Sequence, residues 1–263
     1  MAKLTGSILF TGSMDNMSAY TMQGHEGVIL RKKGGASKKQ IKTGRNFALT
    51  RLNNAEFGGS SKAGKAIRDA IWMVKHLANY NFSGHLNALA KTILKKDTEA
   101  DWGERAIRFS QHHGMLEGFT LNRQLLFNSV VRHPVSCTLS RDEGKASLVL
   151  PALVPGINFY TPPGQHLYRF IFTLGVIPDM ICTPDGYKPQ VPQYHATYLI
   201  TEWHTVTELT TQQNFELALE NFTGLDTSNS LIVAAGIEFG FPLTNDIIQS
   251  VKYAGTATIL ATA

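Results

Sequence analysis

The chain has 263 residues and a formal net charge of +5, with 43% hydrophobic and 17% charged residues. This composition is typical of a folded globular protein with little surface charge, and the length suits one large domain or two modest ones. No apolar run reaches the roughly 18 residues that a membrane-spanning helix needs, so we expect no membrane span.

The N-terminus has neither a long apolar core nor a cleavage site, which predicts cytoplasmic synthesis without a signal peptide. Release as part of a particle is left open. The two cysteines, Cys137 and Cys182, are too few for a disulfide framework. Both lie in apolar, strand-like segments, so we expect buried free thiols.

Residues 4–31 are patterned as two strands, a predicted N-terminal β-ribbon arm over residues 1–35. We expect strands over 4–11 and 17–31, a turn at 12–16, and an interruption at 23–27. An isolated ribbon is marginal in water, so the arm pairs either with the chain's own body or with a neighbouring subunit by strand addition. The arm residues predicted to face an assembly interface are Ile8, Phe10, Tyr20, Val28 and Leu30.

Basic charge is concentrated in one segment. Residues 31–75 hold twelve Lys or Arg against Glu56 and Asp69, a net charge of +10, which leaves −5 for the rest of the chain. The segment could meet nucleic-acid phosphates, an acidic patch on the next copy, or water alone. The predicted phosphate contacts are Arg31, Lys32, Lys33, Lys38, Lys39, Lys42 and Arg45.

A small basic helical unit is expected over residues 36–132. Ser37 with Gln40 predicts a capping box at the first helix, which we expect to stop at residues 56–61. Ser60 or Ser61 would cap a second helix, and residues 83–94 form a third. Asp101 with Glu104 predicts another capping box and a short helix to about residue 112.

From about residue 133 the hydrophobic period changes to two, which predicts a C-terminal antiparallel β-sandwich over 133–263. About seven strands are expected, the last over residues 251–263. Its alternation predicts that Tyr253 and Ile259 face apolar neighbours and belong to the assembly interface, while Lys252, Thr256 and Thr258 face polar surroundings. The predicted fold class is therefore α+β.

The sequence contains only weak matches to catalytic, phosphate-binding or metal-binding motifs. Residues 59–66, GSSKAGKA, resemble a phosphate-binding loop, but Ala66 replaces the hydroxyl that would hold magnesium. His112 and His113 are adjacent, and His195 and His204 fall on opposite strand parities, so no metal-ligand spacing is present. We therefore predict a non-enzymatic protein and assign it no catalytic residue, metal or cofactor.

The segments Thr11-Gly12-Ser13, Asn16 to Tyr20, Ile29 to Gly35 and Phe57-Gly58 resemble the N-terminal region of uncharacterised proteins common in Bacteroidota. Those proteins join a Gly-rich N-terminal ribbon to helices and a β-rich C-terminal half. The resemblance covers about the first sixty residues. It implies the same order of parts and no activity.

Together, these patterns favour a structural, phage-like protein whose copies assemble into a filament, tube or shell through the arm and the strand ends. The alternative is a nucleic-acid-binding or coat protein that uses residues 31–75. A carbohydrate-binding or hydrolytic sandwich is a third hypothesis.

Overall fold

The computed structural model describes residues 2–4, 9–22, 24–193, 195–244 and 247–263. It confirms an α+β protein with a β-rich C-terminal region. The chain divides into two compact units, Met1–Arg51 and Leu52–Ala263. The predicted boundaries after residues 35 and 132 differ from this division, because the helices after residue 52 share a core with the sheets.

The N-terminal unit is a four-stranded antiparallel sheet followed by short helices. The strands are β1 (Ala2–Leu4), β2 (Gly12–Met14), β3 (Met17–Tyr20) and β4 (Val28–Lys32), in the order β1-β4-β3-β2. The predicted turn over 12–16 is too wide, because Gly12–Met14 is itself a strand and the reversal needs only Asp15, at a φ of 45°, and Asn16. Ile8 lies outside the described residues.

Two short helices follow the sheet: α1 (Lys38–Thr43) and the 3-10 helix η1 (Arg45–Phe47). The predicted capping box is present at α1, since the Ser37 hydroxyl accepts from the Gln40 amide and the Gln40 side chain accepts from the Ser37 amide. This arrangement satisfies two amide groups that the first turn of a helix leaves without partners.

Helix α2 (Ala48–Ala70) runs without interruption through residues 56–61, so the predicted stop there is wrong. Tertiary packing explains why glycines occur inside this helix. A Cβ atom at Gly59 would come within 2.6 Å of the Tyr187 ring, and one at Gly64 within 2.1 Å of the Asn87 side chain. These residues permit close approach within the helix rather than ending it. Ser60 caps no second helix, and its hydroxyl donates to the Glu56 carbonyl.

The other helices are short. They are η2 (Trp72–Leu77), α3 (Ser83–Leu94), α4 (Phe109–His112), η3 (His113–Leu116) and α5 (Phe127–Val130). α3 matches its prediction. The capping box expected at Asp101 is absent, because α4 begins only at Phe109 and has no side-chain cap. Asp97 organises this loop instead, accepting from the backbone amides of Glu99, Ala100 and Ala106.

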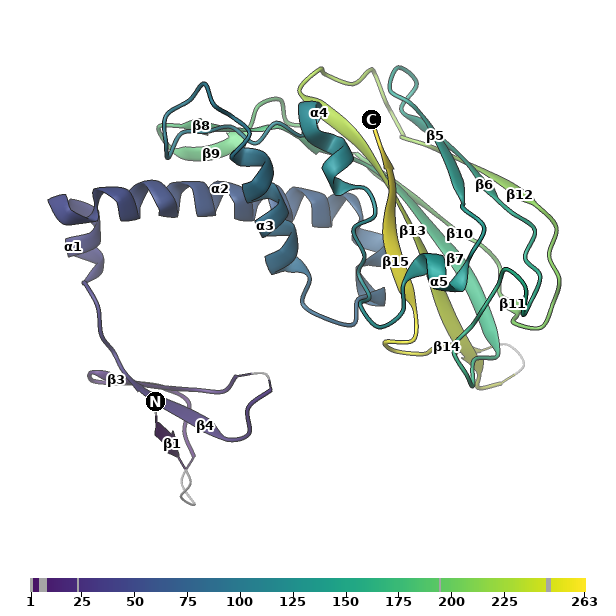
Figure 1. Cartoon of the computed structure of the whole chain (residues 1–263), viewed down its shortest axis with the longest axis horizontal. Coiled ribbons are helices and arrows are strands. Elements are labelled where there is room, and N and C mark those ends of the chain that lie inside the picture. The colour runs from purple at the N-terminus through teal and green to yellow at the C-terminus, as the bar shows by residue number, and fades with distance from the viewer. Residues whose placement is uncertain (1, 5–8, 23, 194, 245–246) are drawn as a thin grey trace. The chain divides into compact units, whose positions relative to one another are not determined.

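Three sheets make up the β-rich region (Figure 1). The six-stranded sheet contains β7 (Leu167–Pro178), β10 (Ala196–Ile200), β11 (His204–Thr205), β13 (Asn229–Pro242), β14 (Ile248–Ser250) and β15 (Thr256–Thr262). The three-stranded sheet contains β5 (Ser136–Ser140), β6 (Lys145–Leu150) and β12 (Gln213–Ala218). β8 (Met180–Thr183) and β9 (Gly186–Pro189) form a separate hairpin.

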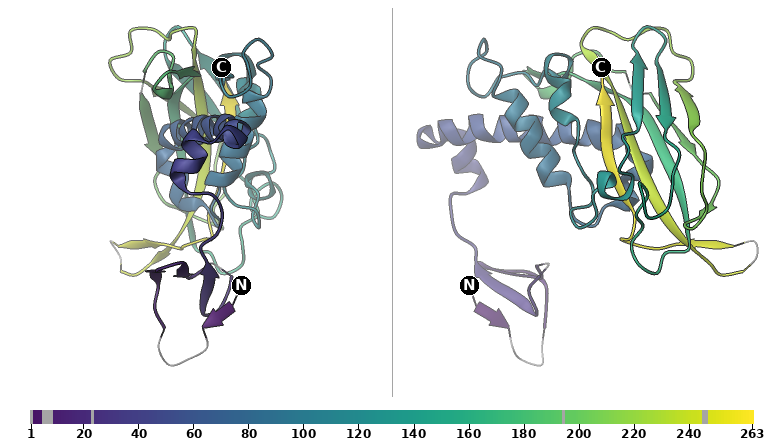
Figure 2. Two further views of the ribbon diagram at one scale, coloured as in Figure 1. Left: turned by 90° about the vertical axis from the view of Figure 1, so that its left-hand side faces the viewer. Right: turned by 45° about the vertical axis from the view of Figure 1, so that its right-hand side comes forward.

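The six-stranded sheet is the middle of three layers (Figure 2). The helices pack on one face against Ile171, Ile232 and Ile259, while the three-stranded sheet packs on the other against Phe170 and Phe172. Each such side chain contributes about 2 kcal/mol when removed from water. Because β7 and β13 are covered on both faces, their sequences read as continuous apolar runs. Among the described residues, no helix is long and apolar enough to cross a membrane.

The final strand is shorter than predicted. It begins at Thr256, and Tyr253 precedes it as an exposed turn residue with a φ of 63°. Thr256 and Thr258 are buried rather than facing polar surroundings, and their hydroxyls donate to the carbonyls of Leu125 and Phe119. Tyr253 therefore does not face apolar neighbours on the strand. Ile259 does pack in the core, as its parity predicts.

Two adjacent glycines of α2 provide a test of the packing. Gly58→Ala adds a Cβ atom with nothing within 4 Å, so it should stabilise the protein by about 1 kcal/mol through helix propensity. Gly59→Ala forces the buried Tyr187 ring to move and should destabilise it by about 1–2 kcal/mol. Thermal and urea unfolding measure the change in unfolding free energy of each variant. Equal stabilisation by the two variants would contradict the contact with Tyr187.

Candidate functional site

The N-terminal sheet has a thin core of its own. Among the described residues of this unit, the buried hydrophobic side chains are Ala19, Val28 and Ile29. Of the predicted interface residues, Val28 is thus buried within the unit, while Phe10, Tyr20 and Leu30 are half-buried. The three buried apolar side chains of the described residues contribute little stability for a unit of this size.

The edges of this sheet are strands β1 and β2. All three residues of β2 are exposed, and the Met14 side chain is 55% exposed. An edge strand presents backbone amide and carbonyl groups that can pair with another strand, and this edge carries no charged side chain to prevent it. The sheet is therefore suited to strand addition.

The two predicted interface residues outside the arm belong to the second unit. Ile259 is 1% exposed in that unit's core and so offers no surface to another subunit. Backbone amides of Gly118 and Leu121 donate to the carbonyls of Ile259 and Ala257, which covers the outer edge of β15. The C-terminal strand is thus already paired on both sides within the chain, while Tyr253 is 70% exposed.

All seven predicted phosphate-contacting residues are exposed and lie in the N-terminal unit, on β4, on the helices α1 and η1, and, for Lys33, just after β4. The ammonium of Lys33 donates to the Asp15 carbonyl at 3.0 Å. A hollow of about 260 Å³ is lined by Ser18, Tyr20, Arg31, Lys33 and Gly34. Residues 1–51 contain nine Lys or Arg and two Asp or Glu, a net charge of +7, so the second unit carries −2.

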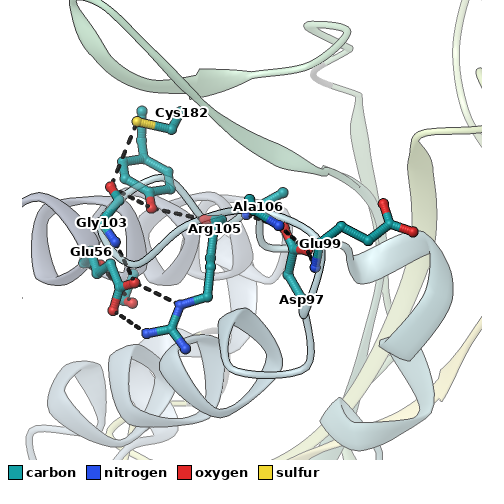
Figure 3. Close-up of polar contacts among 10 residues, drawn as sticks. Glu56, Asp97, Glu99, Gly103, Arg105, Ala106 and Cys182 are labelled. Atoms are coloured by element: carbon teal, nitrogen blue, oxygen red, sulfur yellow. Dashed lines mark hydrogen bonds and ion pairs between the residues drawn. The ribbon is translucent and has the colours of Figure 1, made fainter. Parts of the chain in front are cut away.

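A buried carboxylate on α2 holds the loop that contains Gly103 and Arg105, and this loop in turn contacts the β8–β9 hairpin (Figure 3). Glu56 is fully buried on α2, and its Oε1 accepts from Arg105 Nε at 2.7 Å and from the Gly103 amide at 3.0 Å. Oε2 accepts from Arg105 Nη2 at 2.9 Å. The Tyr187 hydroxyl of β9 donates to the Arg105 carbonyl, and Lys62 of α2 donates to the Tyr187 carbonyl.

These contacts keep Glu56 ionised. Burial alone raises the pKa of Glu56, but the hydrogen bonds from Arg105 and Gly103 and the charge of Arg105 outweigh it, so the net shift lowers the pKa. In this ion pair with Arg105, both Glu56 carboxylate oxygens accept hydrogen bonds from within the chain. No local pattern in the sequence predicts this pair, because the two residues are 49 positions apart.

The cysteines have no activated thiol. Burial raises the pKa of Cys137 to about 11 and also raises the pKa of Cys182. Both remain protonated at neutral pH, whereas a nucleophilic cysteine needs a thiolate. Both are free and half-buried, so they are less buried than expected.

In the part of the chain that the structure describes, the phosphate-loop-like segment and the histidines also lack the arrangement that their chemistry would need. Residues 59–66 form the middle of α2, so their backbone amides are committed to helix hydrogen bonds and cannot cradle a phosphate. His113 contacts the Thr262 hydroxyl through Nδ1. Within the described ranges, no group of three or more His, Cys, Asp or Glu residues could hold a metal ion.

No protein family, no curated protein and no solved structure matches this chain.

Replacing Glu56 with Gln should cost about 3 kcal/mol of unfolding free energy, because it leaves the Arg105 guanidinium partly buried without its counter-charge. Glu104→Gln is the matched control, since Glu104 is exposed in the same loop and should change stability by less than about 0.5 kcal/mol. Urea unfolding at neutral pH measures both values.

The same pair predicts a pH dependence. Since folding lowers the pKa of Glu56 below its usual 4.5, its contribution is complete above about pH 4.5 and is lost as the pH falls through the folded-state pKa. The stability difference between the wild type and Glu56→Gln should therefore shrink in acid. A difference that stays constant from pH 7 to about pH 3 would contradict an ionised Glu56.

Proposed function

We propose that this is a non-enzymatic structural protein whose copies assemble through the N-terminal sheet into a filament, tube or shell. The observation that carries the proposal is the mismatch within residues 1–51. This unit has ordered strands and an uncharged, exposed edge at β2, yet its described residues include few buried apolar side chains. A strand from a second copy would complete it.

The charge distribution supports a second copy as the partner. The N-terminal unit carries +7 and the second unit −2, so opposite charges favour contact between the N-terminal unit of one copy and the second unit of another. Such a contact joins two different surfaces. A heterologous contact that does not close into a ring propagates as a helical polymer.

Removing residues 2–35 should leave a folded, soluble chain with an unchanged melting transition, because the large core lies in Leu52–Ala263. The truncated chain should form no large assemblies by light scattering and negative-stain microscopy. If the truncated chain is unfolded, the arm belongs to the chain's own core and the proposal is wrong.

A pair of point variants tests the edge itself. Met14→Lys places a charge on the exposed edge strand β2, which should block strand addition and abolish assembly. Met22→Lys adds the same charge at an exposed position after β3 has ended and should assemble like the wild type. Equal assembly by the two variants would show that β2 is not the pairing edge.

A nucleic-acid-binding or coat function is the second candidate. It is favoured by the exposed basic residues of β4 and α1 and by the hollow beside Arg31 and Lys33. Phosphate contacts of this kind release counterions, which makes the affinity depend steeply on salt.

If Lys32, Lys38, Lys39 and Lys42 contact phosphates, replacing all four with Gln should reduce the slope of log affinity against log salt by about three. Replacing Lys95 and Lys96, which are exposed in the second unit, should leave the slope unchanged. Absence of binding to single- and double-stranded DNA and RNA at about 50 mM salt would exclude this function.

A further inference from the structure

A second charged cluster lies at the end of the six-stranded sheet, where β13 extends towards β14. Its centre is Glu238, which is 3% exposed. Oε1 of Glu238 accepts from His76 Nε2 at 3.0 Å and from the Ser250 hydroxyl, and Oε2 accepts from Arg169 Nε at 2.6 Å. The Arg169 guanidinium in turn lies 4.4 Å from the centre of the Trp203 ring.

His76 is positioned as a cation. Its Nδ1 is 2.9 Å from the Met73 carbonyl and its Nε2 faces the Glu238 carboxylate. Both partners are acceptors, so only the doubly protonated ring donates to both. The hydrogen bond to Glu238 accordingly raises the pKa of His76, although burial opposes it.

The Glu238 carboxylate already accepts three hydrogen bonds. Burial alone would raise the pKa of Glu238, but the hydrogen bonds from His76, Ser250 and Arg169 outweigh it and lower the pKa to about 2. One negative charge therefore lies between two positive ones, and its oxygens have three donors already. The cluster has a local excess of positive charge and no free carboxylate to attract a cation.

A cavity of about 380 Å³ opens beside this cluster. His76, Glu238, Ser250 and Lys252 supply its polar wall, and Leu77, Val251, Tyr253 and Gly255 supply its apolar wall. The volume falls in the range of small-molecule sites. Such sites typically combine a largely apolar wall with a few polar groups that orient the ligand.

The backbone at the cavity is strained at Tyr253. This residue adopts a φ of 63°, and its ring is largely exposed. A left-handed conformation is rare for a residue with a Cβ atom, and such outliers concentrate at ligand sites. The strained turn keeps an aromatic side chain at the cavity instead of continuing strand β15 towards β14.

We propose that this cavity binds a small organic carboxylate with an apolar body. The ligand's carboxylate pairs with the Lys252 ammonium in the positive field of the His76 imidazolium, whose two N–H groups already donate to Met73 and Glu238. The ligand's apolar body packs against Leu77, Val251 and the Tyr253 ring. A cationic ligand is disfavoured because it would face two positive side chains while the Glu238 oxygens are occupied. This site is separate from the assembly function proposed above, so failure of either leaves the other standing.

The test is a titration of the full-length chain with phenylacetate, phenylacetamide and benzylamine, followed by the backbone amide signals of residues 76–77 and 250–255. Phenylacetate should shift these signals saturably, the neutral amide should bind about tenfold more weakly, and the amine should not bind. Equal binding of the three compounds, or no saturable shift with phenylacetate up to about 10 mM, would overturn the proposal.

Lys252→Gln is the decisive variant, because Lys252 is exposed and its replacement leaves the buried cluster intact. It should weaken phenylacetate binding about tenfold, while Lys95→Gln should have no effect. Binding should also weaken as the pH rises through the raised pKa of His76; the other charged groups around it are Glu238, Arg169 and Lys252. Unchanged affinity in Lys252→Gln, or affinity independent of pH between about 6 and 9, would contradict the assignment.

Discussion

The second unit depends on the pairing of β7 with β13. The two strands pair over twelve residues, from Asn229 with Pro178 to Gly240 with Leu167. Both strands are buried on both faces and mostly apolar, so alternation of polar and apolar side chains cannot by itself fix their register. The register needs other determinants, and the sequences of the two strands contain them.

One determinant is electrostatic. Arg169 and Glu238 are directly opposite one another in the ladder and form the ion pair at 2.6 Å. A slip of one residue would leave a buried carboxylate without its guanidinium, at a cost of several kcal/mol. The other determinant is steric. Gly175 lies against the backbone of Ala70, and Gly236 lies against Leu77 and Val74. A side chain at either position would push the helical layer off the sheet.

Much of the fold could be predicted from the sequence where the signal is local. The apolar runs at 166–177 and 230–239 predicted strands, which the structure contains as β7 and β13, and Ser37 with Gln40 predicted a helix start that it also contains. The errors have a common cause. Residues 56–61 look like a helix stop until Tyr187 is placed against Gly59, and no local pattern reports a contact 128 residues away.

The charged clusters were missed for the same reason. His76 and Glu238 are 162 residues apart, and Arg169 and Glu238 are 69 apart. A signal was nevertheless present, because Glu238 is the single acidic residue within the apolar run 231–241. A carboxylate in a strand that is buried on both faces requires donors, and that requirement could have been stated from the sequence. Which residues supply these donors could not be predicted from the sequence.

The N-terminal sheet is the opposite case, because its strands are ordered while few of its described apolar side chains are buried. We propose that a second copy supplies the missing apolar and backbone contacts. Hydrogen exchange of the backbone amides of β3 and β4, measured over a range of protein concentrations with β13 as the internal reference, tests this claim directly. We expect slow exchange of β13 at every concentration, and exchange of β3 and β4 that slows as copies assemble. Protection of β3 and β4 that equals that of β13 in the dilute, monomeric chain would contradict it.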